Sequence, residues 1–448
     1  MKTLFKTSSR VAGLRALVHA FAWIGLAGVL SAAALVAAAL HALTPREGEW
    51  RTTLRWGPWQ REASVPTLMR WATHPLVLSH LDGHALRTRA GDWRFAMRAD
   101  GSIEAVCAPC AVALLALGPE PVALDRVRVT LAVRGADRFD GALWLGGATE
   151  ATPVVLLWRA ELQRDALKLQ AELPPVPLAR MVALFGEAVP EAARARIDGR
   201  FAIKLEATLG AQGLRFQKLQ PRLDDVGVAG LGTEALIDAD PAQRCRPQPG
   251  VGRVEGWIQN AVVAAEDQRF AEHPGYELDA WLKVWKSNQA DPQALQGAST
   301  ITQQLAKLLY TGDDRSAARK LREWLYAVEM ERTLGKGRIL QLYLAVLPWG
   351  DGICGAEAAA RHHLGKPVNQ LKPREAAWLA SLLINPDQQL RRWAQDDPAA
   401  RARAIGVLQG MRRLPRERRE SEVEALADWQ PPIARPLLAT PLLTSAAP

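Results

Sequence analysis

The sequence predicts an α+β protein of several domains: an N-terminal transmembrane helix, a β-rich middle domain and an α-helical C-terminal domain. Three observations support this fold class. A long segment without charge lies near the N-terminus, apolar and polar side chains then alternate with a period of two, and the apolar period finally becomes that of a helix. A chain of 448 residues is long enough for two or three domains.

The transmembrane helix is predicted from the segment Ala16–Leu43, which contains no Asp, Glu, Lys or Arg. About twenty apolar residues are enough to cross a bilayer. Four basic residues precede the segment: Lys2, Lys6, Arg10 and Arg15. The positive-inside rule therefore makes residues 1–45 a short cytoplasmic N-terminus and an anchor, with the rest of the chain outside the cytoplasm. A cleaved signal peptide is the alternative, because ALVAAALHA offers small residues to a peptidase.

The β-rich domain is predicted over residues 46–237. Alternation is clearest in four segments: 93–98, 127–133, 167–173 and 201–209. Such patterns, bounded by Gly, Pro and Asp, are typical of antiparallel strands with one solvated face. One short helix is expected at Pro177–Gly186. The pattern indicates no activity for this block, and a structural spacer or a docking module for other proteins is the expected role.

The four cysteines are compatible with an oxidising compartment. Cys107 and Cys110 form a C-x-x-C pair, which a redox-active pair or half of a metal site would also show. No second pair or His cluster accompanies it, so we expect a short local disulfide. Cys245 lies in the linker at the start of the C-terminal domain and Cys354 lies further on in GICGAEAAA, and we expect them to form a second disulfide.

The net charge of +9 does not indicate a nucleic-acid-binding protein, because Lys and Arg are scattered among acidic residues. The sequence contains no zinc-ligand pattern, RNP-type motif or basic block. A basic surface that faces anionic lipid or a pyrophosphate ligand fits this charge as well.

The C-terminal domain is predicted over residues 238–430, between the linker DADPAQRCRPQPGVG and an irregular tail at 431–448. Its most informative run is QGASTITQQLAKLLY. Thr300 and Gln303 have the spacing of a capping box, so a helix should begin there. Thr300, Gln304 and Lys307 then share one face of that helix. A hydroxyl, an amide and an ammonium in one row suit a polar or anionic ligand.

Five blocks occur in order around this run: AAEDQRFAEHPG, QGASTITQQLAKLLY, ARKLREWLYAVEMER, KGRILQLYLAVLPWG and REAAWLASLLINP. Together they resemble the family 51 glycosyltransferases, which polymerise peptidoglycan from lipid II. This family includes monofunctional transglycosylases and the glycosyltransferase domains of class A penicillin-binding proteins. The resemblance covers roughly Gln243–Ala427 and implies a lysozyme-like helical fold. No S-x-x-K, S-x-N and K-T-G set follows, so no transpeptidase domain is predicted.

The resemblance also implies roles for individual residues. Forming a β-1,4 glycan from lipid-linked sugar pyrophosphates, with inversion, needs a general base for the sugar hydroxyl and positive charge at the leaving group. Glu266 matches the catalytic Glu and would be the base, while Asp267 would orient neighbouring groups. Glu323 is the second carboxylate and would position the cations or a divalent ion. The cations that would hold the pyrophosphate are Lys307, Arg319 and Lys320. The side chains that would hydrogen-bond sugar or phosphate oxygens are Thr300, Gln303 and Gln304.

The segment Tyr276–Leu295 joins the first two blocks, and in the family it corresponds to a mobile flap near the bilayer that admits a lipid-linked substrate. Lysines alternate with tryptophans in it: Trp281, Lys283, Trp285 and Lys286. This composition suits a membrane interface, and an ordinary amphipathic helix is the alternative. The chain departs from the family at Ala345, where Asn is common, and at Leu308, where a polar residue is common. Both departures leave the loop packing and the processivity open.

The sequence therefore predicts a peptidoglycan glycosyltransferase in the bacterial inner membrane, with its bulk in the periplasm. The expected partners are lipid II, the nascent glycan strand, the membrane and, through the β-rich domain, other cell-wall synthesis or envelope proteins. No cofactor is required, although a divalent cation (Mg²⁺ or Mn²⁺) at the pyrophosphate is left open. A lytic transglycosylase or muramidase is one alternative, and a non-catalytic envelope scaffold or lipid-binding protein is another.

Overall fold

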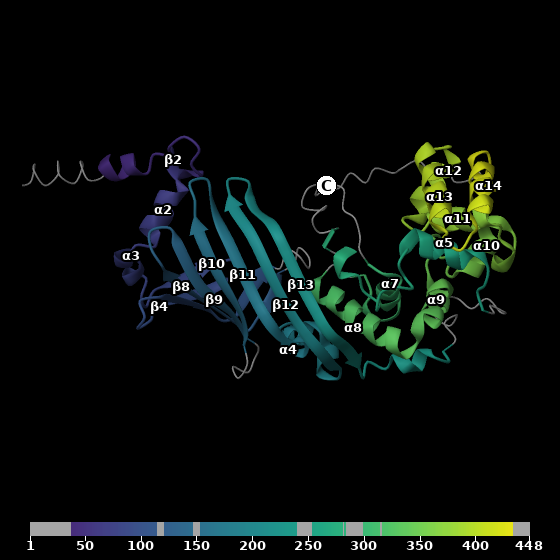
Figure 1. Ribbon diagram of the computed structural model, residues 1–448, viewed down its shortest axis with the longest axis horizontal. Helices are drawn as coiled ribbons and strands as arrows, with labels where there is room; N and C mark the ends of the chain where they lie inside the picture. The colour runs from purple at the N-terminus through teal and green to yellow at the C-terminus, as the bar shows by residue number, and fades with distance from the viewer. Residues whose placement is uncertain are drawn as a thin grey trace, which may run out of the picture.

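The computed structural model describes residues 37–113, 121–146, 153–239, 253–280, 282–283, 299–313 and 316–432. A large sheet occupies the left of Figure 1 and a group of helices the right, so the predicted α+β class is confirmed. Within the described ranges, none of the helices combines the length and the apolar character needed to cross a bilayer. The predicted anchor lies almost entirely outside those ranges.

The large sheet contains nine antiparallel strands of the described residues in the order β13-β12-β11-β10-β9-β8-β5-β4-β3. Its strands are β3 (Ala85–Thr88), β4 (Gly91–Met97), β5 (Ile103–Cys107), β8 (Arg126–Val133), β9 (Arg138–Gly146), β10 (Val154–Leu162), β11 (Ala166–Pro177), β12 (Arg196–Gly210) and β13 (Gly213–Ala229). All four segments with clear alternation are strands here, namely β4, β8, β11 and β12. Period-two patterning was therefore a sufficient signal for this region.

Smaller elements flank the sheet. Two hairpins are formed by β1 (Arg51–Trp56) with β2 (Trp59–Ser64), and by β6 (Cys110–Ala113) with β7 (Pro121–Leu124). The short helices are α2 (Val65–Ala72), α3 (Pro75–His80), α4 (Leu178–Ala183), η1 (Gly186–Ala188) and η2 (Pro190–Ala193). Helix α4 is the one predicted between Pro177 and Gly186. The predicted disulfide between Cys107 and Cys110 is confirmed, and both residues are buried.

The helical region begins after the β-rich part of the chain. Its elements are α5 (Trp257–Glu266), α7 (Ile301–Ala306), the π-helical turn η5 (Lys307–Thr311), α8 (Ala317–Thr333), α9 (Gly335–Val346), α10 (Ala356–Leu364), η6 (Val368–Gln370), α11 (Pro373–Ser381), α12 (Pro386–Ala394), α13 (Pro398–Gly410) and α14 (Arg416–Ala427). Helix α11 is buried along nearly its whole length and packs against α5, α13 and α14. The core around it fixes α5, whose last residue is Glu266.

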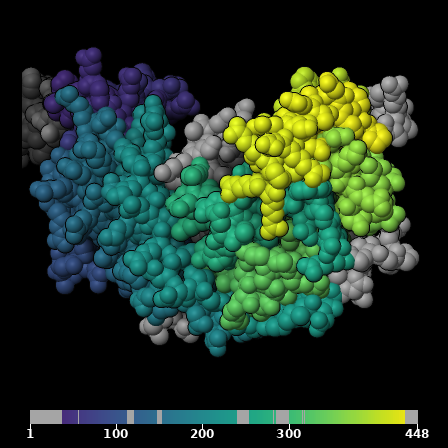
Figure 2. All heavy atoms as spheres, turned by 45° about the vertical axis from the view of Figure 1, so that its right-hand side comes forward, coloured from purple at the N-terminus to yellow at the C-terminus, as the bar shows by residue number. Residues whose placement is uncertain are grey.

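Packing is continuous across the predicted domain boundary at residue 237. Val182, Val189, Val228 and Leu231 come from the β-rich part, yet they belong to the same apolar core cluster as the helices. The short helix η3 (Thr233–Leu236) follows β13 and packs on α8. In the lower part of Figure 2 the teal spheres of the β-rich region touch the green spheres of the helical region. At this end the sheet and the helices therefore share one core.

Candidate active site

Glu266 ends α5 with its side chain half-buried, and its Oε2 accepts a hydrogen bond from Gln304 Nε2 at 3.1 Å. The Tyr343 hydroxyl donates in turn to Gln304 Oε1, which fixes the orientation of that amide. Burial raises the pKa of the Glu266 carboxyl above its ordinary value, while the Gln304 hydrogen bond and the charge of Arg403 act against this rise. A carboxylate with a raised pKa is suited to accept a proton near neutral pH.

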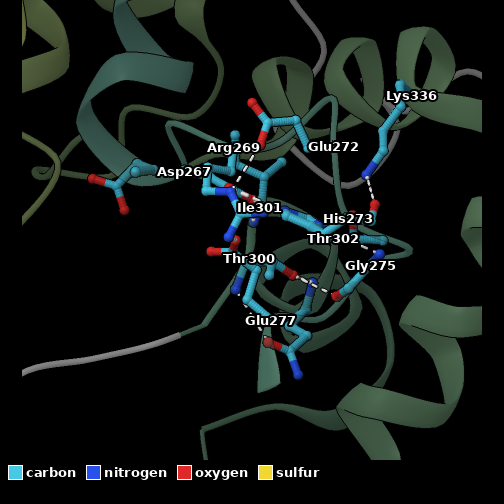
Figure 3. Close-up of polar contacts among 12 residues, drawn as sticks. Asp267, Arg269, Glu272, His273, Gly275, Glu277, Thr300, Ile301, Thr302 and Lys336 are labelled. Atoms are coloured by element: carbon cyan, nitrogen blue, oxygen red, sulfur yellow. Dashed lines mark hydrogen bonds and ion pairs between the residues drawn. The ribbon is translucent and has the colours of Figure 1, made fainter. Parts of the chain in front are cut away.

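Asp267 is buried directly beside this carboxylate and is engaged by protein donors. His273 Nε2 lies 3.0 Å from both Asp267 oxygens, and the Ile301 backbone N–H donates to Oδ2 at 2.9 Å. Because His273 Nδ1 accepts from the Gly275 N–H at 3.1 Å, Nε2 carries the ring proton and donates it to Asp267. Figure 3 shows these groups gathered at the start of α7. Asp267 thus orients its neighbours.

The turn at Gly275 ties this loop to α8. Gly275 has a φ of +91°, and a Cβ there would lie 2.8 Å from Glu331 Cγ and 3.0 Å from the Ala327 carbonyl oxygen. Its own carbonyl accepts from Thr300 Oγ1 at 2.6 Å. Only glycine fits this close approach with this backbone conformation, so packing requires the glycine that ends the AAEDQRFAEHPG block.

The predicted capping box at the start of α7 is present. Thr300 Oγ1 accepts from the Gln303 N–H at 3.2 Å, and Gln303 Oε1 accepts from the Thr300 N–H at 3.1 Å. The amide of Gln304 turns to Glu266 instead. Lys307 pairs with the exposed Asp313, with Nζ and Oδ1 2.6 Å apart. Of the row that the sequence predicts, Thr300 caps the helix, Gln304 hydrogen-bonds Glu266 and Lys307 reaches toward solvent.

Helix α8 carries the cationic cluster. Glu323 is 1% exposed and accepts hydrogen bonds from Arg319 on one oxygen and from Lys320, at 2.7 Å, on the other. Lys320 Nζ also donates to Ser299 Oγ at 2.7 Å, which places the cluster beside the first residues of α7. Two cations surround one carboxylate, so the cluster keeps a net positive charge. Arg319 Nε is buried and has no hydrogen-bond partner among the described residues.

The surroundings of Glu323 do not fit a protein-bound divalent cation. Arg319 and Lys320 each donate to one Glu323 oxygen, and two cations this close repel a divalent ion. In the described part of the chain no group of three or more His, Cys, Asp or Glu side chains is placed to hold a metal. Arg319 and Lys320 are the positive charges that this cluster presents.

Several supporting residues went unnoticed in the sequence. Tyr343 is fully buried, and burial raises the pKa of its phenol well above the ordinary value, so it remains a hydrogen-bond donor. Lys336 Nζ donates to the His273 carbonyl at 2.6 Å and to Glu331 at 2.8 Å, above the Phe270 ring. Both residues stand in the KGRILQLYLAVLPWG block, which was the only available signal. The partners Gln304 of Tyr343 and His273 of Lys336 lie too far away in sequence to be paired by spacing.

The remaining predictions about this region concern the two departures from the family, the second disulfide and the flap. The Ala345 carbonyl lies 2.7 Å from where a Cβ on Gly355 would stand, so this loop is tightly packed without the Asn common in the family. Leu308 packs half-buried against the core. Cys354 is disulfide-bonded, but its predicted partner Cys245 lies outside the described residues. Most of the predicted flap, including both of its tryptophans, lies outside them as well.

A helical domain with one half-buried carboxylate beside a separate cationic cluster is the arrangement that a sugar transferase with an anionic leaving group requires. Residues 238–412 match the Transglycosylase family. The biosynthetic peptidoglycan transglycosylase of Azoarcus sp. (strain BH72) is 46% identical over 164 residues, 36% of this chain and 71% of the relative. That of Laribacter hongkongensis is 36% identical over 163 residues, which are 34% of this chain and 72% of the relative. The chain belongs to the peptidoglycan transglycosylase family.

The match is confined to the helical region. The transglycosylase of Aeromonas hydrophila is 50% identical over 129 residues, 29% of this chain and 54% of the relative. That of Nitrosomonas eutropha is 43% identical over 134 residues, which are 30% of this chain and 55% of the relative. The chain thus spans little more than half of the length of these two relatives. The family match begins at residue 238, where the β-rich region ends.

Proposed function

We propose that this protein is a peptidoglycan glycosyltransferase that polymerises lipid II into β-1,4-linked glycan strands and releases polyprenyl pyrophosphate. The observation that carries the proposal is that Glu266, a half-buried carboxylate with a raised pKa, accepts from the neutral amide of Gln304, while Arg319 and Lys320 on α8 pair with Glu323. A hydrolase that inverts needs a second carboxyl group as acid at the leaving oxygen. A pyrophosphate is already a weak base and needs positive charge instead.

Glu266 acts on the acceptor sugar. Its carboxylate takes the proton of the acceptor 4-hydroxyl while that oxygen attacks the anomeric carbon of the donor from the face opposite the pyrophosphate. The new C–O bond forms as the bond to the pyrophosphate oxygen breaks, so the configuration inverts. Gln304, held by Tyr343, keeps the carboxylate in position during this step. The bonding electron pair leaves with the pyrophosphate.

The cations of α8 stabilise that leaving group. Arg319 and Lys320 stand in one cluster, and Lys307 projects from the neighbouring turn with 39% of its side chain exposed. Glu323 holds Arg319 and Lys320 in place by accepting a hydrogen bond from each. The reaction needs no bound metal in this scheme, and a divalent ion, if used, would be held by the pyrophosphate itself.

The location follows from the substrate. The peptidoglycan transglycosylase family works in the cell envelope, where the sugar chain of lipid II is exposed. We place the catalytic region on the periplasmic side of the inner membrane, with the uncharged segment at Ala16–Leu43 as a single-pass anchor. The segment between the first two blocks would then lie at the membrane interface and admit the substrate.

The decisive experiment is glycan elongation by the purified full chain in detergent with lipid II. Glu266→Gln keeps the size of the side chain but cannot accept the acceptor proton, so activity should fall about 10²–10⁴-fold. Glu272→Gln is the matched control, because Glu272 belongs to the same block but is exposed and paired only with surface arginines. Both variants should keep the wild-type melting temperature.

Other outcomes separate the alternatives. Release of soluble anhydro-muropeptides from finished sacculi would identify a lytic enzyme. Failure of the wild type to act on either substrate, with and without Mg²⁺ or Mn²⁺, would favour a scaffold and exclude the proposed reaction.

A further inference from the structure

Helix α8 has a second set of polar side chains beside the cationic cluster. Arg319 and Glu323 lie one turn apart on one side of the helix. On the neighbouring side, four residues recur at the i, i+4, i+7, i+11 spacing of a single helical stripe: Arg322, Tyr326, Glu329 and Thr333. Each residue of this stripe makes a hydrogen bond or ion pair with the β-rich region. One helix therefore connects the sheet to the site.

Glu329 is the centre of this contact. Its side chain is fully buried, and its carboxylate accepts from the backbone N–H groups of Leu231, Gly232 and Thr233 at 2.8–3.2 Å. The Thr233 hydroxyl donates as well, at 3.1 Å. Gly232 has a φ of +86°, and this left-handed residue lets three successive N–H groups converge on one anion. The end of the longest strand, β13, is thus fastened to α8.

Two more contacts reinforce it from η2. Arg322 Nε donates to both oxygens of Glu191 at 2.9 Å, and Glu191 is only 3% exposed. Arg194 donates to the Tyr326 hydroxyl at 2.8 Å. The ring of Tyr326 stacks on Tyr310, at a centroid distance of 4.0 Å, and Tyr310 lies in the same turn as Lys307. Helix α8, which carries Arg319 and Lys320, therefore contacts the β-rich region directly. The turn η5, which carries Lys307, contacts it through the ring of Tyr326.

We propose that the β-rich region is part of the catalytic unit, and that Glu329 is a positioning residue which holds α8, and with it Arg319 and Lys320, in register with Glu266. This inference rests on the proposed transferase function. A buried carboxylate that loses its donors is strongly unfavourable, so Glu329 opposes movement of α8 relative to the end of β13. The β-rich region is then more than a spacer between an anchor and an enzyme.

The test uses two substitutions in the full chain. Glu329→Gln replaces one acceptor oxygen by an amide that cannot accept from the converging N–H groups. Thr233→Val removes one donor and keeps the volume, and it remains informative if Glu329→Gln fails to fold. Glu420→Gln, in an exposed pair on α14, is the control. Each protein is assayed with lipid II for kcat, KM and pH dependence, and by amide hydrogen exchange of residues 317–323.

Displacement of groups that bind substrate can cost up to about a hundredfold even when the change lies far from the chemistry. We expect KM for lipid II to rise between about ten- and a hundredfold in Glu329→Gln, and less in Thr233→Val, with the acid limb of the pH profile unmoved. Amide exchange of 317–323 should accelerate in both. A purely structural role would lower the melting temperature and leave KM and this exchange at control values, and that result would overturn the inference.

The proposed function can fail separately. If the wild type does not consume lipid II, the reaction is wrong, and the exchange rates alone decide the coupling. Unchanged exchange at 317–323 in both variants then overturns it, and faster exchange supports it.

Discussion

Within the described residues, Glu266 accepts a hydrogen bond from the amide of Gln304, and that amide is itself held by the buried Tyr343. The sequence places these three residues in three different blocks. Burial raises the pKa of the Glu266 carboxyl, and the Gln304 hydrogen bond is the largest influence that lowers it. The pH dependence of the reaction is therefore a direct readout of this small network.

Gln304→Met should shift the acid limb of kcat/KM to higher pH. The base works only when deprotonated, and the Gln304 hydrogen bond lowers its pKa, so removing the donor raises that pKa further and narrows the active range from below. The measurement is kcat/KM for lipid II across the acid and neutral range. Gln370→Met, at an exposed position, is the control and should leave the limb in place. An acid limb that stays put or moves down in Gln304→Met would contradict this account.

At the scale of the element, α8 combines two buried carboxylates in one helix, Glu323 toward the site and Glu329 toward the sheet. Each is satisfied by a different kind of donor, side-chain cations for the first and backbone N–H groups for the second. A helix with such anchors on two sides has little freedom to rotate or slide. In the proposed function, this rigidity holds the cations at a fixed place for the pyrophosphate.

Glu323→Gln should lower both stability and activity. The substitution leaves Arg319, 11% exposed, and Lys320 without their counter-charge, and breaking a buried pair in this way costs about 3 kcal/mol of unfolding free energy. The same substitution at Glu420, in an exposed i, i+4 pair, should change it by less than about 0.5 kcal/mol. Denaturant unfolding measures the difference, and lipid II turnover should fall only in the first variant. Equal effects of Glu323→Gln and Glu420→Gln would show that Glu323 contributes no more to stability and activity than an exposed glutamate.

Local signals were enough for much of the architecture. The capping box at Thr300, the disulfide of Cys107 and Cys110, and the strands with alternating side chains each depend on residues a few positions apart. Glu329 gave no such signal, because a glutamate at helical spacing reads as a solvated residue. Its donors lie almost a hundred positions earlier and are backbone groups, which carry no side-chain pattern. The predicted boundary at residue 237 rests on a change in composition, and composition contains no information on whether one apolar core extends across it.

At the scale of the whole molecule, a covalent link is expected across the start of the helical region. Cys354 is disulfide-bonded and stands in an antiparallel bridge with Pro348. We predict Cys245 as its partner, which would close a loop of about a hundred residues and contribute up to about 4–5 kcal/mol in the chain-entropy model. Thiol labelling of the oxidised, denatured protein should find no free cysteine. Cys354→Ser should expose one thiol, at Cys245, and lower the melting temperature, whereas labelling of both residues in the wild type would refute the link.

The edge of the large sheet has a consequence for how copies of this protein behave when crowded together. Among the described strands, β13 pairs only with β12, so seventeen residues of backbone border the sheet. An edge of this length invites cross-chain pairing and fibre growth. Here Pro221 lacks a backbone N–H, Lys218 and Arg222 add charged side chains, and irregular register opposite β12 interrupts its flatness. The strand can thus be long enough to reach α8 without becoming a template for aggregation.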